Sequence, residues 1–118
     1  MRKAAVAWLD VAGRPPYPVW CQWVDDSLYV VSGPDEQLAP GLAHVGGVVR
    51  VSARGDHGGR IVTWPARVSR VRPESKEWAT AVPQLAAKRL NGPPAGELVE
   101  RWARTAMVSR LTPVEPPA

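Results

Sequence analysis

The amino-acid sequence predicts a mainly β domain with C-terminal helices and one further strand after them. Apolar, β-branched runs separated by Gly, Pro and Asp follow one another up to residue 72. Beyond Pro73 the apolar residues recur at helical spacing instead. The length of 118 residues matches one domain, whose core needs neither a metal nor a disulfide to hold it.

The first elements are predicted as a strand over 3–9 and a hairpin with strands over 19–24 and 28–32. Asp10 and Gly13 end the first strand, and Asp25 opens the turn of the hairpin. Alternation places Trp20 and Trp23 on opposite faces of the hairpin. Since a half-solvated sheet is apolar on one face only, both faces of this hairpin should be covered.

The next two strands, 48–54 and 60–72, are joined by a short Gly-rich turn and should pair. Alternation gives 48–54 one apolar face and one polar face, and the same holds for 61–71. Pairing then gathers one cationic, hydroxyl-rich surface made of Arg50, Ser52, Arg54, Thr63, Arg67 and Ser69. Guanidinium and hydroxyl groups suit a phosphate, although a solvated face or a subunit contact through Arg stems would show the same pattern.

Proline and capping residues predict the remaining boundaries. Pro65, in the middle of its strand, predicts an edge position or a bulge. Ser75 is a predicted N-cap for a helix that is kinked at Pro83 and runs through Leu90. A second helix over 96–106 and a strand over 107–111 complete one domain over 1–113, followed by a flexible tail over 114–118.

Residues with catalytic chemistry are few; the sequence does not identify which residue would be catalytic, and it predicts no metal site. His44 and His57 fall in predicted loops, and Cys21 lies in mid-strand, where a thiol is usually a small buried hydrophobe. No phosphate-binding glycine motif is present. Of the six tryptophans, most should fill the core, while Trp20 and Trp64 are candidates for stacking on a planar ligand. If the protein is an enzyme, a bound cofactor would carry the chemistry.

The overall charge and the N-terminus bear on partners and location. A formal net charge of +4 permits nucleic-acid binding, but the basic residues are dispersed among acidic ones. The N-terminal apolar run is interrupted by Asp10, too early for a signal peptide, and no membrane-length stretch follows. These features predict a cytoplasmic protein that does not bind membranes.

The order of elements and three local motifs resemble the FMN-binding split β-barrel superfamily. These relatives include pyridoxamine 5′-phosphate oxidase and the flavin- or deazaflavin-dependent reductases. The motifs are Pro18-Val19-Trp20, the turn from Asp25 to Tyr29, and Ser32-Gly33-Pro34. The resemblance spans residues 4–71 and implies a six-stranded antiparallel split β-barrel that forms a homodimer, with flavin sites between the subunits. One face of the hairpin would then fill the barrel, and the other would meet the partner subunit or the cofactor.

For function, the resemblance implies binding of FMN, with deazaflavin and haem ranking below it, and a role as an oxidoreductase that transfers hydride to or from a small organic substrate. The phosphate would be held by Arg50, Ser52, Arg54 and Arg67, with Ser32, Gly33, Gln37, Trp20 and Trp64 near the rest of the cofactor. One departure stands out, because residues 35–40 are acidic and proline-broken where the family carries Lys or Arg. Two alternatives therefore stay open. The first is a cofactor-free dimeric split barrel that binds a ligand or a protein, and the second is a basic β-barrel that binds nucleic acid.

Overall fold

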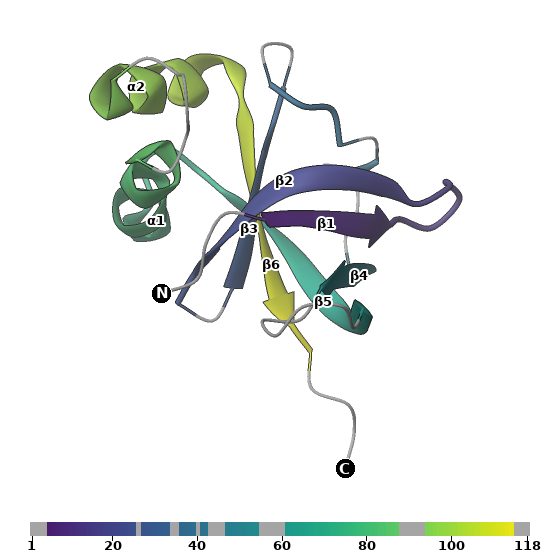
Figure 1. Ribbon diagram of the computed structural model, residues 1–118. Helices are drawn as coiled ribbons and strands as arrows, with labels where there is room; N and C mark the ends of the chain where they lie inside the picture. The colour runs from purple at the N-terminus through teal and green to yellow at the C-terminus, as the bar shows by residue number, and fades with distance from the viewer. Residues whose placement is uncertain are drawn as a thin grey trace.

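A computed structural model describes residues 5–25, 27–33, 36–39, 41–42, 47–54, 61–87 and 94–114. Six antiparallel strands form a closed barrel in the order β1-β2-β3-β6-β5-β4 (Figure 1). Their bounds are β1 Ala5–Asp10, β2 Tyr17–Val24, β3 Ser27–Ser32, β4 Val48–Arg54, β5 Ile61–Val71 and β6 Met107–Pro113. Helices α1 (Lys76–Ala87) and α2 (Ala95–Thr105) connect β5 to β6. The predicted fold class, a mainly β domain with C-terminal helices and six barrel strands, is confirmed.

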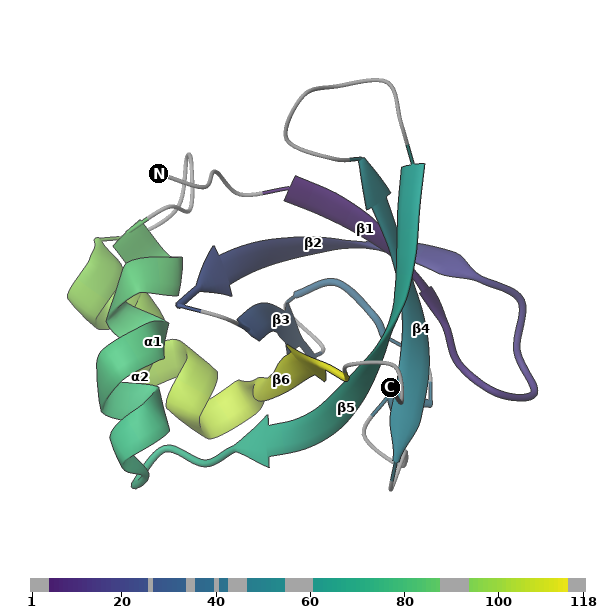
Figure 2. The same cartoon turned by 90° about the horizontal axis from the view of Figure 1, so that it is seen from below.

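The two helices lie together on one side of the barrel, and β4 lies on the opposite side (Figure 2). The backbone N–H of Trp78 donates to Ser75 Oγ at 3.1 Å, so the predicted N-cap is confirmed. Helix α1 continues through Pro83 as one helix to Ala87, and residues 88–90 of the predicted helix lie outside the described residues. Buried residues before and after the proline, among them Trp78 and Leu85, hold both halves of the helix on the barrel. No helix among the described residues is long and apolar enough to cross a membrane.

Two apolar cores result from this arrangement. The first fills the barrel with inward side chains of every strand, and the second lies between the barrel wall and the helices. Trp23 packs against the first core and Trp20 against the second. Both faces of the β2–β3 hairpin are therefore covered, as predicted. The Trp20 side, however, packs against the helices of the same chain, where the resemblance implied the partner subunit or the cofactor.

Pro65 does not lie in an edge strand, because β5 pairs with β4 on one side and with β6 on the other. This outcome contradicts the edge prediction. The register explains why the missing N–H is tolerated: β6 ends at Pro113, the partner of Ala66. The Pro65 carbonyl accepts from the Val114 N–H at 3.0 Å on the β6 side. In an antiparallel strand the N–H and C=O of one residue point toward the same neighbouring strand. Pro65 therefore lacks its N–H donor on the β6 side, at the place where the β6 ladder stops.

Candidate functional site

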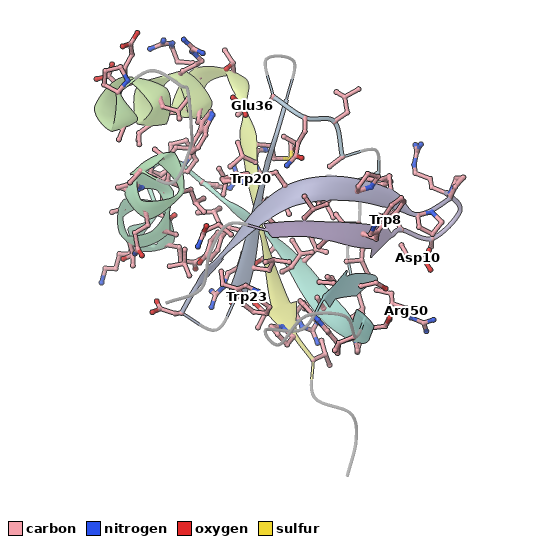
Figure 3. All side chains as sticks on the ribbon, in the orientation of Figure 1. Trp8, Asp10, Trp20, Trp23, Glu36 and Arg50 are labelled. Atoms are coloured by element: carbon pink, nitrogen blue, oxygen red, sulfur yellow. The ribbon has the colours of Figure 1, made fainter. Side chains whose placement is uncertain are left out.

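The outward side chains of β1, β4 and β5 form one exposed polar and aromatic surface, called here the β1–β4–β5 face. It comprises Trp8, Asp10, Arg50, Ser52, Thr63, Pro65 and Arg67. The strand register arranges these residues in rows across the sheet. One row runs Trp8, Ser52, Thr63, and the next runs Asp10, Arg50, Pro65. In Figure 3, Trp8, Asp10 and Arg50 lie on the side of the barrel away from the helices.

The predicted cationic, hydroxyl-rich surface is confirmed at the level of the strand register. Arg50 and Ser52 pair with Pro65 and Thr63, and Arg67 lies two residues further along β5 on the same face. The hydroxyls of Ser52 and Thr63 are hydrogen-bonded at 2.9 Å. Arg54 continues the β4 row opposite Ile61, but its side chain lies outside what the structure describes.

The charges of this face are largely uncompensated within the chain. Arg50 and Arg67 are exposed, and no ion pair within the described residues engages either guanidinium. Asp10 is directly opposite Arg50 in the register, yet no ion pair joins the two in the described part of the chain. The face therefore offers two free guanidinium groups and two hydroxyls to an acidic ligand, with one carboxylate beside them.

Trp8 was missed by the sequence analysis as a site residue. Half of its surface is exposed (50%), whereas its β1 neighbours Ala7 and Leu9 are fully buried. This alternation in Val6-Ala7-Trp8-Leu9 was the available signal, since it sends the largest side chain of the strand outward. An exposed indole beside Ser52 presents an aromatic surface on which a planar ring can stack.

Strand β6 extends the polar surface, which the sequence analysis also missed because it assigned this strand no partner. Thr112 pairs with Arg67, and Arg110 pairs with Ser69. The predicted residue Ser69 is therefore exposed on the same side of β5, next to a third guanidinium.

Unlike Arg50 and Arg67, Arg110 is held by partners within the chain. Its Nε donates to the buried Ser27 Oγ at 3.0 Å, and Nη1 lies 3.6 Å from Glu77 Oε2. Ser27 Oγ also lies 3.3 Å from the Thr112 hydroxyl. Burial raises the pKa of the adjacent Tyr29, while the positive charge of Arg110 works in the opposite direction. This cluster satisfies its own polar groups and helps to hold β3, β6 and α1 together.

A second group of predicted residues, Ser32, Gly33, Gln37 and Trp20, lies where β2 and β3 separate. The Gln37 amide is bound to the barrel: its Oε1 accepts from the Trp20 N–H at 2.6 Å, and its Nε2 donates to the carbonyls of Trp20 (2.7 Å) and Val31 (3.1 Å). These hydrogen bonds occupy the amide with backbone groups, so Gln37 is placed as a structural residue. Ser32 ends β3, paired with Met107.

The residues beside Gln37 are tied to helix α2. Glu36 Oε2 accepts from the indole N–H of the buried Trp102 at 3.1 Å. At Gly33, an added Cβ would lie 2.8 Å from the Thr105 carbonyl oxygen. A carboxylate and a tightly packed glycine leave this segment poorly suited to a phosphate. Pro34, Asp35 and Pro40, which belong to the acidic segment noted in the sequence, lie outside the described residues.

Trp64 occupies a third location, the inner side of β5. Its ring centroid lies 5.5 Å from that of Trp23, with the planes 37° apart, and it packs against the barrel core. Arg67 projects from the opposite side of the same strand. Apart from Arg54, whose side chain lies outside what the structure describes, the predicted cofactor residues fall in three places within one chain, and of these only Arg50, Ser52 and Arg67 share the β1–β4–β5 face.

The residues of this face fit the acidic group of a planar cofactor such as FMN. Two exposed guanidiniums and the Ser52–Thr63 hydroxyl pair supply hydrogen-bond donors for a phosphate or carboxylate, and Trp8 supplies a flat apolar surface. Asp10 opposes such a ligand unless its charge is neutralised. For haem iron the chain's two histidines would be natural ligands, and both lie outside the described residues.

Metal chemistry and thiol chemistry have no support among the described residues. No group of three or more His, Cys, Asp or Glu side chains is placed there to hold a metal ion. Cys21 is buried at 1% exposure, as predicted, and burial raises the pKa of its thiol to about 12. A thiol with such a pKa is protonated at neutral pH and is a poor nucleophile.

Comparison with known proteins places the fold among split barrels. The chain is similar to HutZ, the heme storage protein from Vibrio cholerae, with a TM-score of 0.65 and 18% identity over 95% of this chain and 83% of the other. It is also similar to a candidate 5-nitroimidazole antibiotic resistance protein from Bacteroides thetaiotaomicron, with a TM-score of 0.56 and 15% identity over 98% and 75% of the two chains. No family model and no curated protein matches the sequence. The predicted split β-barrel fold is confirmed.

Proposed function

We propose that this protein binds a planar ligand with an acidic group, FMN in the first instance, on the β1–β4–β5 face. The observation that carries the proposal is the pairing of free guanidinium groups with hydroxyls on one exposed surface. A bound flavin would supply hydride-transfer chemistry, so an oxidoreductase role for this chain depends on that binding. The residues of the chain would bind and orient the ligand.

The spacing of the two arginines suits a single phosphate. Arg50 and Arg67 lie on adjacent strands, two residues apart in the register. The rise per residue and the strand spacing put their Cα atoms about 8 Å apart. Two extended Arg side chains can therefore converge on one anion, with Ser52 and Thr63 as further donors in the next row.

Trp8 is proposed to contact the ring system of the ligand. It stands in the row of Ser52 and Thr63, so a ring stacked on the indole lies beside the proposed phosphate contacts. The outer face of one barrel can contact only one side of such a ring. We therefore propose that the protein acts as a homodimer, in which the second subunit covers the ligand.

A test of this proposal uses the absorption spectrum of the purified protein, before and after addition of FMN and desalting. The wild-type protein is expected to retain a flavin band near 450 nm, and the Arg50→Ala/Arg67→Ala variant is expected to lose it. An Arg70→Ala/Arg72→Ala variant removes the same charge from exposed residues outside the face and should retain the band. Haemin is the second ligand to be added, because HutZ is described as a heme storage protein. A wild-type protein that retains neither ligand contradicts the proposal.

One observation favours a second function, a cofactor-free module that binds another protein chain. Val6, Trp8 and Val48, which all point outward from β1 and β4, are 60%, 50% and 51% exposed. Large apolar side chains gathered on an exposed surface are typical of an interaction site. A colourless protein that takes up neither FMN nor haemin, yet forms a stable complex through this face, would support this alternative.

A further inference from the structure

The first part of β5, residues 61–64, extends beyond the end of β6. The β5–β6 pairing stops at Ala66, whose partner is Pro113. One last hydrogen bond then joins the Val114 N–H to the Pro65 carbonyl at 3.0 Å. On its other side this stretch of β5 is paired with β4 throughout, and Figure 2 shows it running past the end of β6. Among the described residues, one side of 61–64 is therefore a free sheet edge.

The backbone groups at the centre of this edge belong to Thr63. Along an antiparallel strand, successive residues direct their N–H and C=O to alternate sides. The Pro65 carbonyl points toward β6, so the N–H and the C=O of Thr63, two residues earlier, point to the same side. Within the described part of the chain, no backbone hydrogen bond is made on that side of Thr63. Thr63 thus presents one donor and one acceptor to a strand placed in line with β6.

The residues of this edge favour strand pairing and lack the features that usually protect exposed edges. The sequence Ile61-Val62-Thr63-Trp64 is β-branched and aromatic, with neither a charge nor a proline. Natural sheets protect their free edges with charged residues, prolines or covering segments. On the inner side of β5, Val62 is 45% exposed, and the partly buried Trp64 packs against Trp23. An added strand could therefore bury an apolar side chain against Val62 and Trp64.

We infer that this edge binds an extended segment of another protein, which adds to the barrel as a short strand beside β5. The backbone of that segment pairs with the N–H and C=O of Thr63. Alternate side chains of the segment point to the two faces of the sheet. Those on the inner side meet Val62 and Trp64, so they are expected to be apolar. Those on the outer side lie beside the hydrogen-bonded hydroxyls of Thr63 and Ser52, so they are expected to be polar.

A segment of another protein fits this edge better than the chain's own continuation or a second copy. The chain continues after β6 with two prolines, 116–117, which have no N–H to donate to the Thr63 carbonyl. Two copies paired symmetrically at Thr63 would bring Ile61 of the second copy opposite Pro65 of the first. Val114 already occupies that position. A short, proline-free segment that stops before Val114 meets neither obstacle.

The probe for this inference is a short synthetic peptide of alternating Thr and Val, added to the protein without flavin, so the result does not depend on the ligand proposed above. In the free protein, the Thr63 N–H should exchange with solvent at least about 100-fold faster than the Arg67 N–H, which faces Thr112 in the β5–β6 ladder. Saturating peptide should slow exchange at Thr63 at least about tenfold, as followed by NMR. A peptide with methylated threonine nitrogens lacks the donors that would face β5. It should bind at least about tenfold more weakly.

Two variants test the edge from the side of the protein. Thr63→Pro removes the edge N–H without removing a hydrogen bond to β4, and it should weaken peptide binding about tenfold. Val62→Lys removes exposed apolar surface beside the edge and should weaken binding by a similar factor. Leu38→Lys is the matched control. Leu38 is 72% exposed between β3 and β4, so this variant should bind the peptide as the wild type does.

Circular dichroism verifies that each variant is folded, and the methylated peptide tests the wild-type protein even where a variant does not fold. Slow exchange of the Thr63 N–H in the free protein would overturn the inference, because the edge would then already be occupied. A wild-type protein that does not bind the peptide, or binds the methylated peptide equally well, would also overturn it. So would folded Thr63→Pro and Val62→Lys variants that bind the peptide as tightly as the wild type.

Discussion

The side-chain amide of Gln37 is hydrogen-bonded to both backbone polar groups of Trp20, at 2.6 Å from the N–H and 2.7 Å from the carbonyl. The paired register of β2 with β3 is confined to the hairpin end, from Gln22 opposite Tyr29 to Val24 opposite Ser27. Further along β2, the Gln37 side-chain amide makes the two hydrogen bonds to Trp20 that a peptide group of a neighbouring strand would otherwise make. Its Nε2 also donates to the Val31 carbonyl. One side chain thus satisfies the backbone at the point where the barrel splits.

Replacing Gln37 by Leu should destabilise the protein by about 2–4 kcal/mol, because three hydrogen bonds are lost and partly buried backbone groups of Trp20 are left without them. Urea unfolding measures the change. The matched control is Gln84→Leu on α1, where the amide donates only to the exposed Thr80 carbonyl. That variant should change stability by less than about 0.5 kcal/mol. Equal stabilities of the two variants would contradict the structural role of Gln37.

Gly33 should not tolerate a side chain. Its φ of +155° disfavours L-residues, and an added Cβ would lie 2.8 Å from the Thr105 carbonyl oxygen and 3.1 Å from Ala106 Cα. Gly33→Ala is therefore expected to lower the free energy of unfolding by about 1–3 kcal/mol. Gly96→Ala on α2 meets open space and should leave stability unchanged or raise it by up to ~1 kcal/mol. Thermal unfolding of the two variants provides the comparison, and a stable Gly33→Ala protein would contradict the packing described here.

Cys21 should be inert toward thiol reagents in the native state. Burial raises the pKa of its thiol to about 12, so the reactive thiolate is scarce at pH 8. We expect modification by a disulfide reagent at pH 8 to be more than ~100-fold slower in native than in urea-unfolded protein. Rapid labelling of folded protein would show that the thiol is accessible.

The raised pKa of the Cys21 thiol also predicts how the stability of the protein changes at high pH. The folded state keeps the Cys21 proton up to about pH 12, while the unfolded state loses it near the ordinary value of 9.0. The unfolded state thus binds fewer protons between these values, and the thiol's contribution to stability falls as pH rises through that window. The stability of Cys21→Ala, followed by urea unfolding from pH 8 to 10.5, should therefore decline less steeply than that of the wild type. If the free energies of unfolding of the wild type and of Cys21→Ala declined equally with pH, this contribution of the thiol would be contradicted.

Local alternation was sufficient to predict the polar surface of β4 and β5. The two strands are joined by a short turn, and the period of two separates Arg50 and Ser52 from Val49 and Val51. The same alternation already put Trp64 on the side opposite Arg67, so the sequence itself argued against grouping them at one site.

Long-range closure of the barrel could not be predicted from the local pattern. Trp8 and Asp10 join the face only because β1 pairs with β4, about forty residues away in the chain. The role of Gln37 depends likewise on where β2 and β3 separate, which no local propensity encodes. Pro65 was misjudged for the same reason, since its tolerance in β5 depends on where β6 stops.

The central claim is that free arginines on the β1–β4–β5 face bind the acidic group of a planar ligand. Its most direct test compares the dissociation constants of FMN and riboflavin, which differ only in the phosphate, by quenching of flavin fluorescence. The proposal predicts that the wild-type protein binds FMN at least about tenfold more tightly, as a charge-assisted contact of roughly 1.5–3 kcal/mol requires. In Arg50→Ala/Arg67→Ala this preference should disappear. Equal affinity of the wild-type protein for the two flavins, or no binding of either, would contradict the claim.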